Sequence, residues 1–273
     1  MNKVKWIINE VIYNDSLYHN LPEIIQNLGM EVTIINNTEL LMGKMPYNKS
    51  DCVITYASIN VTRKLKDYFG TYMNEDNLKY SKYTSLLNVD PHLFLNNDAI
   101  LTTFYNFKNN YQYYYDLFNN DRLFIKPNSG IKLFTGYIVP LNDINHELNY
   151  LSHTSLTNDS LLVISAPKDV KNEARFLIID HNIVDSSLYE IGKYSTPEDN
   201  IVPDNYKEFV ENIIKNDWQP DPIYSIDVGT VENELKIIEL NSFSSAGLYA
   251  MDMNKVIKEV SEFTSKSYED FYY

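Results

Sequence analysis

The sequence "YSIDVGTVENELKIIELNSF" (224–243) carries polar side chains within two segments that otherwise have the composition of β-strands. Glu239 and Asn241 lie two positions apart, so on a strand they point to the same face. If "VENE" forms the turn of a hairpin, Asp227 on the partner strand lies close to Glu239. Two carboxylates and an amide are therefore expected to converge at one place.

These three side chains would supply oxygen ligands for a divalent cation. The two carboxylates would repel each other unless a cation joined them, and Mg²⁺ is a hard ion held by a few carboxylates while substrate phosphates and waters complete its octahedron. The alternative is a solvated polar strand face, because Asp, Glu and Asn are common near hairpins. The two strands alone leave both interpretations open.

A glycine-bearing loop upstream is the second candidate for chemistry. The segment "FIKPNSGIKLFTGYIV" (124–139) places Lys126 at the end of a strand, followed by Ser129, Gly130, Lys132 and Gly136. Backbone N–H groups of such a loop, together with a lysine, can contact phosphate oxygens. The GxxxxGK[ST] pattern of a Walker loop is absent from the sequence. A lysine before proline is often only a surface residue, so the loop gains weight from its combination with the acidic strands.

The first 95 residues predict a small α/β layer with parallel strands. Apolar residues of the first helix share one face before Gly29 ends it, and no glycine fingerprint follows the first strand, so no dinucleotide site is expected there. Pro91 and the sequence "FLNNDAI" mark a boundary between residues 85 and 100. The predicted strands are 4–9, 31–36 and 51–56, and the predicted helices are 16–30 and 60–69.

After residue 95 the pattern changes to strands joined in hairpins, with three helices. One hairpin is predicted to turn at His181 and Asn182, and the last residues of the chain are expected to be loosely ordered. The predicted helices are 101–118, 204–216 and 253–263, and the predicted strands, besides the two acidic ones, are 122–127, 134–139, 161–167, 173–180 and 183–191.

Composition excludes several classes of protein. The single cysteine, Cys52, rules out an internal disulfide framework and lies in an apolar run typical of a buried thiol. No long apolar segment indicates a signal peptide or membrane span, so we expect a cytosolic protein. A net charge of −14 argues against binding to nucleic acid, and any cations that bind an anion must be gathered locally. The 23 tyrosines, clustered for example in "NNYQYYYDLF", form either an exposed aromatic surface or, as we favour, half-buried packing.

Together these segments resemble the ATP-grasp superfamily of carboxylate–amine ligases. The resemblance rests on the order of "FIKP", "SGIKLFTG", "LLVISAP", "EARF" and the paired acidic strands, and it covers residues 121–263. It is strongest to a small phage and bacterial clade in which a family arginine is replaced by lysine and the last strand reads much like "ELNSFSSAGLY". The implied fold is α/β (α+β): an ATP-grasp domain of two α+β lobes at 96–273, with a hinge near 163–167, preceded by a small Rossmann-like domain at 1–95.

The resemblance also implies roles for the residues already singled out. Asp227, Glu239 and Asn241 would hold magnesium, and Lys126 would contact the α and β phosphates of ATP. The loop from Ser129 to Gly136, with Gly130 and Lys132, would close over the triphosphate.

Further positions follow from the same resemblance. The strand end formed by Val163, Ile164, Ser165, Ala166 and Pro167 would offer backbone groups to the edge of adenine. Glu173 and Arg175 alternate onto one face, near the nucleotide or an acyl phosphate, and their alternative is an ordinary surface pair. Lys193 would stand in for the family arginine that steadies the transferred phosphate.

The implied activity is an ATP- and Mg-dependent ligase that joins a carboxylate to an amine through an acyl phosphate and releases ADP and phosphate. The alternatives are a nucleotide-binding or interaction protein with reduced catalysis, which the tyrosine-rich segment favours, and a kinase on the same fold. The joint presence of Asp227, Glu239 and Asn241 favours an enzyme. The five histidines lie apart from these motifs, and the sequence names neither substrates nor oligomeric state.

Overall fold

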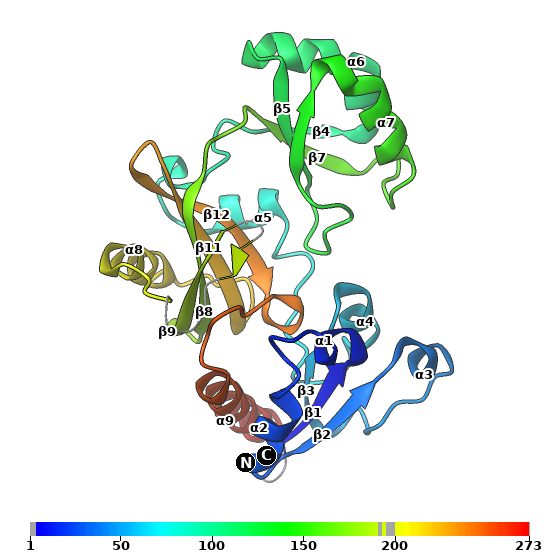
Figure 1. The fold of residues 1–273 in the computed structure, drawn as a ribbon, viewed down its shortest axis with the longest axis vertical. Coiled ribbons are helices and arrows are strands. Elements are labelled where there is room, and N and C mark those ends of the chain that lie inside the picture. Colours follow the sequence, from blue (N-terminus) through cyan, green and yellow to red (C-terminus); the bar gives the residue numbers. More distant parts are fainter. Residues whose placement is uncertain (1–3, 191–192, 195–199, 273) are drawn as a thin grey trace.

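The computed structural model describes residues 4–190, 193–194 and 200–272, except for the side chains of residues 41, 189, 190, 193 and 194. Its strands form three sheets, which lie one above another in Figure 1. The four-stranded sheet and its helices form an upper lobe. The five-stranded sheet lies in the middle, and the three-stranded sheet lies at the bottom.

The three-stranded sheet is parallel, as predicted, with the order β2-β1-β3. Its central strand is almost entirely buried, which is typical of a parallel sheet covered on both faces. Gly29, at φ +80°, follows the helix that precedes β2. The elements are β1 (Val4–Asn9), α1 (Glu10–Tyr13), α2 (Leu21–Asn27), β2 (Glu31–Ile35), α3 (Asn37–Leu41), β3 (Cys52–Tyr56) and α4 (Ile59–Lys64).

Helix α9 (Met253–Tyr272), from the end of the chain, packs against this first sheet. The Trp6 indole N–H donates to Ser261 Oγ at 3.2 Å, and Val256 lies in the same buried cluster. The helix continues to Tyr272, so the expectation of a loosely ordered end is wrong for residues 264–272. Aromatic contacts of Tyr268 and Tyr272 with Phe69 explain the extension, because they give the last turns a packing partner.

The upper lobe is an antiparallel sheet of order β4-β7-β5-β6. The predicted helix 101–118 begins only at Phe104, because residues 100–103 form the strand β4 and the Thr103 hydroxyl accepts from the Asn106 N–H as the helix cap. The elements are α5 (Tyr80–Leu86), which precedes the lobe, β4 (Ile100–Thr103), α6 (Phe104–Phe118), β5 (Arg122–Pro127), β6 (Tyr137–Pro140), α7 (Ile144–Ser152) and β7 (Leu161–Ser165).

The central sheet has the order β10-β9-β8-β11-β12 and is antiparallel throughout. Its β8–β9 turn consists of Asp180 and His181, one position earlier than predicted, and its β11–β12 turn consists of Glu232 and Asn233. All four residues have positive φ, as two-residue hairpin loops of type I′ require. The elements are β8 (Lys171–Ile179), β9 (Asn182–Glu190), β10 (Lys193–Tyr194), α8 (Asp204–Ile214), β11 (Ile223–Val231) and β12 (Glu234–Ser242), followed by a short 3₁₀ turn at Phe243–Ser245.

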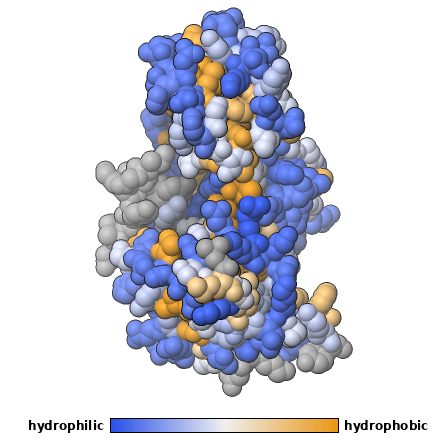
Figure 2. Space-filling view, turned by 90° about the vertical axis from the view of Figure 1, so that its right-hand side faces the viewer, coloured by the Kyte–Doolittle hydropathy of each residue, from blue (hydrophilic) through white to orange (hydrophobic). Residues whose placement is uncertain are grey.

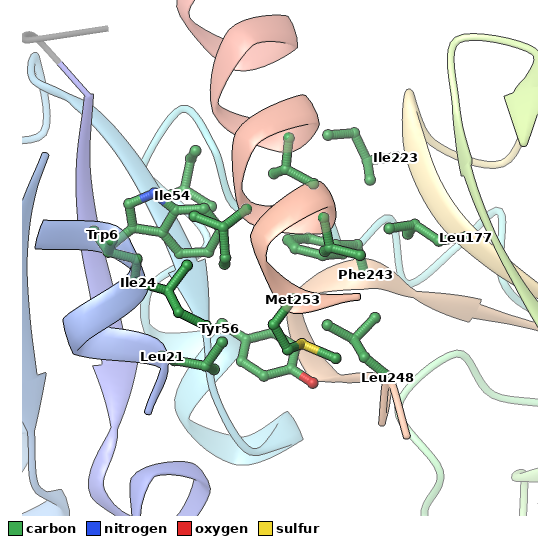
Figure 3. Close-up of a cluster of buried hydrophobic side chains, with 14 of the residues drawn as sticks. Trp6, Leu21, Ile24, Ile54, Tyr56, Leu177, Ile223, Phe243, Leu248 and Met253 are labelled. Carbon is green, nitrogen blue, oxygen red and sulfur yellow. The ribbon is translucent and has the colours of Figure 1, made fainter. Parts of the chain in front are cut away.

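The first sheet and the central sheet share one hydrophobic core. Figure 3 shows Trp6 and Ile54 of the first sheet facing Leu177 and Ile223 of the central sheet, with Phe243 and the start of α9 between them. The strand residues that carry Asp227 therefore emerge from a packed junction. Within the part of the chain that the structure describes, no helix has both the length and the apolar character needed to cross a membrane.

Candidate functional site

The register of the central sheet brings the polar residues of three strands together. Asp227 on β11 lies opposite Glu239 on β12, and on its other side it lies opposite Arg175 on β8. Asn241 follows Glu239 by two positions, so both point to the same face, as the sequence predicts. A β-bulge after Asp227 shifts the pairing with β12 and separates this polar part of the hairpin from its tip.

Asp227 and Arg175 form a buried ion pair. Arg175 Nε donates to Asp227 Oδ1 at 2.7 Å, and Nη2 donates to Oδ2 at 2.6 Å, while Nη1 donates to the Gly247 carbonyl at 2.9 Å. Asp227 is fully buried and Arg175 is 4 % exposed. Asn241 Nδ2 also donates to Asp227 Oδ2, at 3.0 Å. Both oxygens of Asp227 are therefore engaged by protein donors, and direct binding of an ion by Asp227 would require that one of these bonds be exchanged.

Glu239, in contrast, meets a lysine of the glycine-bearing loop. Lys132 Nζ donates to Glu239 Oε1 at 3.1 Å. Burial would raise the pKa of Glu239, but the positive charges of Lys132, Lys126 and Arg175 outweigh it and lower the pKa to about 2. The carboxylate is therefore ionised at neutral pH and lies where a positive charge is strongly favoured.

Lys126 lies beneath the loop, on β5. Its ammonium is 5.2 Å from the centre of the Tyr80 ring and 3.4 Å from the Tyr83 hydroxyl. Burial lowers the pKa of Lys126, and the charges of Glu239 and Asp227 act against this shift. An ammonium held among aromatic rings with few hydrogen-bond acceptors is well placed to bind an incoming anion.

The glycines of the loop lie where side chains would not fit. A Cβ on Gly130 would approach the Glu75 carbonyl oxygen to 2.5 Å, and a Cβ on Gly136 would approach the Phe124 ring to 2.8 Å. Ser129 Oγ accepts from the Ile131 N–H at 3.2 Å, and Lys132 has φ +44°. The loop is thus closely packed at both ends and turns sharply between them.

A cavity of about 210 Å³ lies between the upper lobe and the central sheet. Its lining contains both kinds of predicted side chain, the cations of the loop and the oxygen ligands of β12. Among the described residues, Asp227, Arg175 and Val163 to Ala166 do not line it. The predicted residues that do are Lys126, Ser129, Gly130, Lys132, Gly136, Glu173, Glu239 and Asn241.

The sequence did not identify Tyr80, Tyr83 and Asn96, which also line the cavity. Tyr80 and Tyr83 stand three positions apart on α5, a spacing that places them on one helical face, and this was the available signal. Asn96 lies in an irregular segment, and the Ser165 hydroxyl donates to its Oδ1 at 2.9 Å. Nothing in the sequence pattern marks it.

The expected free strand edge at residues 163–167 needs a correction. Strand β7 is central in its sheet, and Val163 and Ile164 pair with β4 on one side and with β5 on the other. Their backbone groups are used within the sheet. The chain leaves the sheet only after Ser165, where the Ala166 N–H donates to Asp98 Oδ2 at 3.2 Å. Free backbone groups for a ligand are therefore confined to the end of the predicted segment.

The remaining predicted residues lie farther from this geometry. The backbone of Lys193 pairs with Glu190 in β10, but its side chain lies outside the described residues. Arg175 lies behind Asp227 and is not a surface residue. A carboxylate and an amide oxygen beside paired cations fit the donor set that Mg²⁺ and a polyphosphate would need together.

Comparison with known proteins agrees with this geometry. Residues 108–259 match the family model of an ATP-grasp domain, family 2 of the arginine-to-lysine clade. Comparison with curated proteins gives no match.

Solved structures similar to the chain are ATP-grasp proteins. The ATP-grasp ligase PsnB, complexed with a phosphomimetic variant of its minimal precursor, Mg and ADP, has a TM-score of 0.56 and 10 % identity over 96 % of this chain and 98 % of PsnB. D-alanine–D-alanine ligase from Bacillus anthracis has a TM-score of 0.52 and 14 % identity over 98 % of each chain. The RimK domain protein from Sphaerobacter thermophilus has a TM-score of 0.60 and 9 % identity over 94 % of this chain and 99 % of its own. At these identities the similarity concerns the fold.

Proposed function

The chain belongs to family 2 of the arginine-to-lysine clade of ATP-grasp domains, and on that premise we propose that it is an ATP- and Mg-dependent ligase. The reaction would join a carboxylate to an amine and release ADP and phosphate. The observation that carries the proposal is that Lys126 and Lys132 line the same cavity as Glu239 and Asn241. Cations for the phosphates and oxygen ligands for magnesium are thus in one place.

The lysines would bind the triphosphate from two directions. Lys126 is fixed in β5 below the cavity, whereas Lys132 lies in the loop above it and is held by Glu239. When ATP enters, Lys132 would exchange Glu239 for phosphate oxygens, and the loop from Ser129 to Gly136 would exclude water from the reacting groups. Adenine would lie at the end of β7, near Ser165 and Ala166.

The oxygen ligands would then be left to magnesium. Glu239 and Asn241 would contact it directly, and Asp227 would either join them by exchange or hold Asn241 in place through the observed bond to its amide nitrogen. When bound, magnesium would supply positive charge that offsets the negative charge of the transferred phosphoryl group. We also propose that Glu173, which lines the cavity, contacts the nucleotide.

The chemistry proposed for the site has two displacements. A substrate carboxylate oxygen attacks the γ-phosphorus, the bond to the β–γ bridging oxygen breaks, and ADP leaves. The amine nitrogen then attacks the carbonyl carbon of the acyl phosphate, the C–O bond to phosphate breaks, and the nitrogen loses a proton. Arg175 and Lys193 remain the proposed cations for the transferred group, Lys193 directly and Arg175 after it releases Asp227.

The similar structures suggest which acceptors to test. PsnB is complexed with a precursor, and the Bacillus anthracis enzyme is named for D-alanine. Peptides and amino acids are therefore the first substrate pools for this chain. Mass spectrometry of reactions with ATP and magnesium should detect ADP and a product lighter than its two precursors by one water. ADP with a phosphorylated acceptor would instead identify a kinase.

Variants of the two lysines test the nucleotide site itself. Lys126→Ala and Lys132→Ala should each weaken MgATP binding in calorimetry, because each removes a charge-assisted phosphate contact. Lys236→Ala, at an exposed pair with Glu234 outside this cavity, is a matched control and should bind MgATP as wild type does. Unchanged affinity in both loop variants would refute the placement of the triphosphate.

A further inference from the structure

A second and larger cavity, of about 1010 Å³, lies where the first sheet meets the central sheet. One wall is α4 and the residues after it, with Arg63, Lys64 and Lys66. The opposite wall is the segment 71–75 together with Asp221, which lies just before β11. The chain forms a lined groove here that no part of the proposed ATP chemistry uses.

The walls of this groove are fastened to each other. Arg63 Nε contacts Glu75 Oε1 at 3.0 Å, which joins α4 to the segment 71–75. The Asn74 N–H donates to Asp221 Oδ2 at 2.9 Å, which joins that segment to the central sheet. The groove is therefore formed before any ligand arrives, so less ordering is needed when one binds.

The charge of the groove differs from that of the whole chain. The net charge of the chain is −14. In the groove, Glu75 neutralises Arg63, whereas neither Lys64 nor Lys66 forms an ion pair with a described residue. Burial raises the pKa of Asp221 to about 7, so this carboxyl is partly neutral at pH 7. The groove is thus a locally positive site on an acidic protein.

The groove lies next to the glycine-bearing loop of the ATP site. Glu75 lines the groove, Leu78 lines the ATP cavity, and the Glu75 carbonyl lies against Gly130. In Figure 1, α4 lies on the right-hand side, below the upper lobe. Figure 2 views the molecule from that side, and the surface there is hollowed at mid-height, with hydrophilic residues around a narrow apolar strip. A chain bound in the groove could therefore continue towards the ATP cavity.

We propose that this groove binds an acidic peptide segment of the ligase substrate, with Lys64 and Lys66 recognising its carboxylates. The inference rests on the proposed function. The volume of the groove is at the upper end of the roughly 300–1000 Å³ typical of small-molecule pockets, so it accommodates several residues. Nucleic acid is a poor fit, because the overall negative charge repels a phosphate backbone.

Asp221 would make this binding dependent on pH. An ionised Asp221 repels a ligand carboxylate, whereas a protonated one donates a hydrogen bond to it. The other charged or titratable groups around it are Arg63, Lys64, Lys66 and Glu75 on the walls and Tyr72 in the adjoining segment. Binding should therefore be tighter at pH 6 than at pH 8, and Asp221→Asn should reduce this difference.

Calorimetry with capped tetraglutamate, and with capped tetraglutamine as its neutral counterpart, tests the proposal. Wild type should bind only tetraglutamate, and a Lys64→Gln/Lys66→Gln variant should bind it about tenfold more weakly, as expected for the loss of two partly exposed charge contacts. Lys255→Gln/Lys258→Gln, at exposed positions of α9, is the matched control and should bind as wild type does.

Absence of tetraglutamate binding, equal binding of tetraglutamine, or equal loss in both double variants would overturn the proposal. Displacement of tetraglutamate by equimolar inorganic phosphate would also overturn it, by indicating a general anion site. MgATP binding is measured on the same samples. If it persists while tetraglutamate fails to bind wild type, the groove assignment fails and the proposed ligase site stands. The reverse result would separate the two in the other direction.

Discussion

The buried pair of Arg175 and Asp227 permits a sharp test of how the site is held together. Arg175→Met keeps most of the side-chain length but leaves the Asp227 carboxylate fully buried without its two guanidinium bonds. Removing one partner of a buried ion pair typically destabilises a protein by about 3–5 kcal/mol, because the remaining charge is uncompensated. The loss of the bond to the Gly247 carbonyl acts in the same direction.

Urea unfolding followed by tryptophan fluorescence measures this effect, since Trp6 is buried in the core shared by the first and central sheets. Arg63→Met is the matched control, because Arg63 pairs with Glu75 at the surface, where both side chains are more than one third exposed. It should lower the free energy of unfolding by less than about 1 kcal/mol. The double variant Arg175→Met/Asp227→Leu should regain most of the lost stability, because it removes the orphaned charge as well.

A loss of less than about 1 kcal/mol in Arg175→Met would refute this reasoning, because a surface pair shows an effect of that size. So would a double variant that is less stable than Arg175→Met. In either case Asp227 would have to be stabilised by other groups, and the case for Arg175 as the residue that holds it would be lost.

Three further predictions concern single positions. Because the pKa of Glu239 is lowered from 4.5 to about 2, its ionised form stabilises the fold above about pH 4.5, and this contribution is lost as the pH falls towards 2; wild type should therefore lose more stability over this interval than Glu239→Gln, and parallel pH profiles in urea unfolding would contradict this. Gly130→Ala would place a Cβ 2.5 Å from the Glu75 carbonyl oxygen, so we expect the loop to shift and MgATP to bind more weakly in calorimetry, and unchanged affinity would show that the loop adapts. Burial raises the pKa of Cys52 to about 11, so iodoacetamide at pH 8 should label it only in urea, as mass spectrometry can detect.

The sequence by itself determined the local elements and the type of chemistry. Strands β1, β2, β3, β5 and β7 were predicted within two residues at each end, because apolar runs bounded by polar and turn residues are a local signal. The two-residue spacing of Glu239 and Asn241 fixed their common face for the same reason. The glycine loop was found because glycine tolerates positions that other residues do not.

The division of the chain at residue 95 stays a prediction, and the tertiary structure adds a fact that bears on it. Helix α9 packs against β1 and β3, although most of the chain separates them in sequence. Periodicity gave α9 an apolar face but not the partner of that face. A contact between distant segments depends on their joint packing, which no window of sequence contains.

The arrangement of charges was likewise decided only in three dimensions. The sequence grouped Asp227 with Glu239 and Asn241 as three equivalent ligands, and treated Arg175 and Lys132 as contacts for phosphate. The structure pairs Arg175 with buried Asp227 and Lys132 with half-buried Glu239. Sequence spacing gives the face on which a side chain lies, but the ionic partner of that side chain depends on which strand lies beside it and how deeply both are buried.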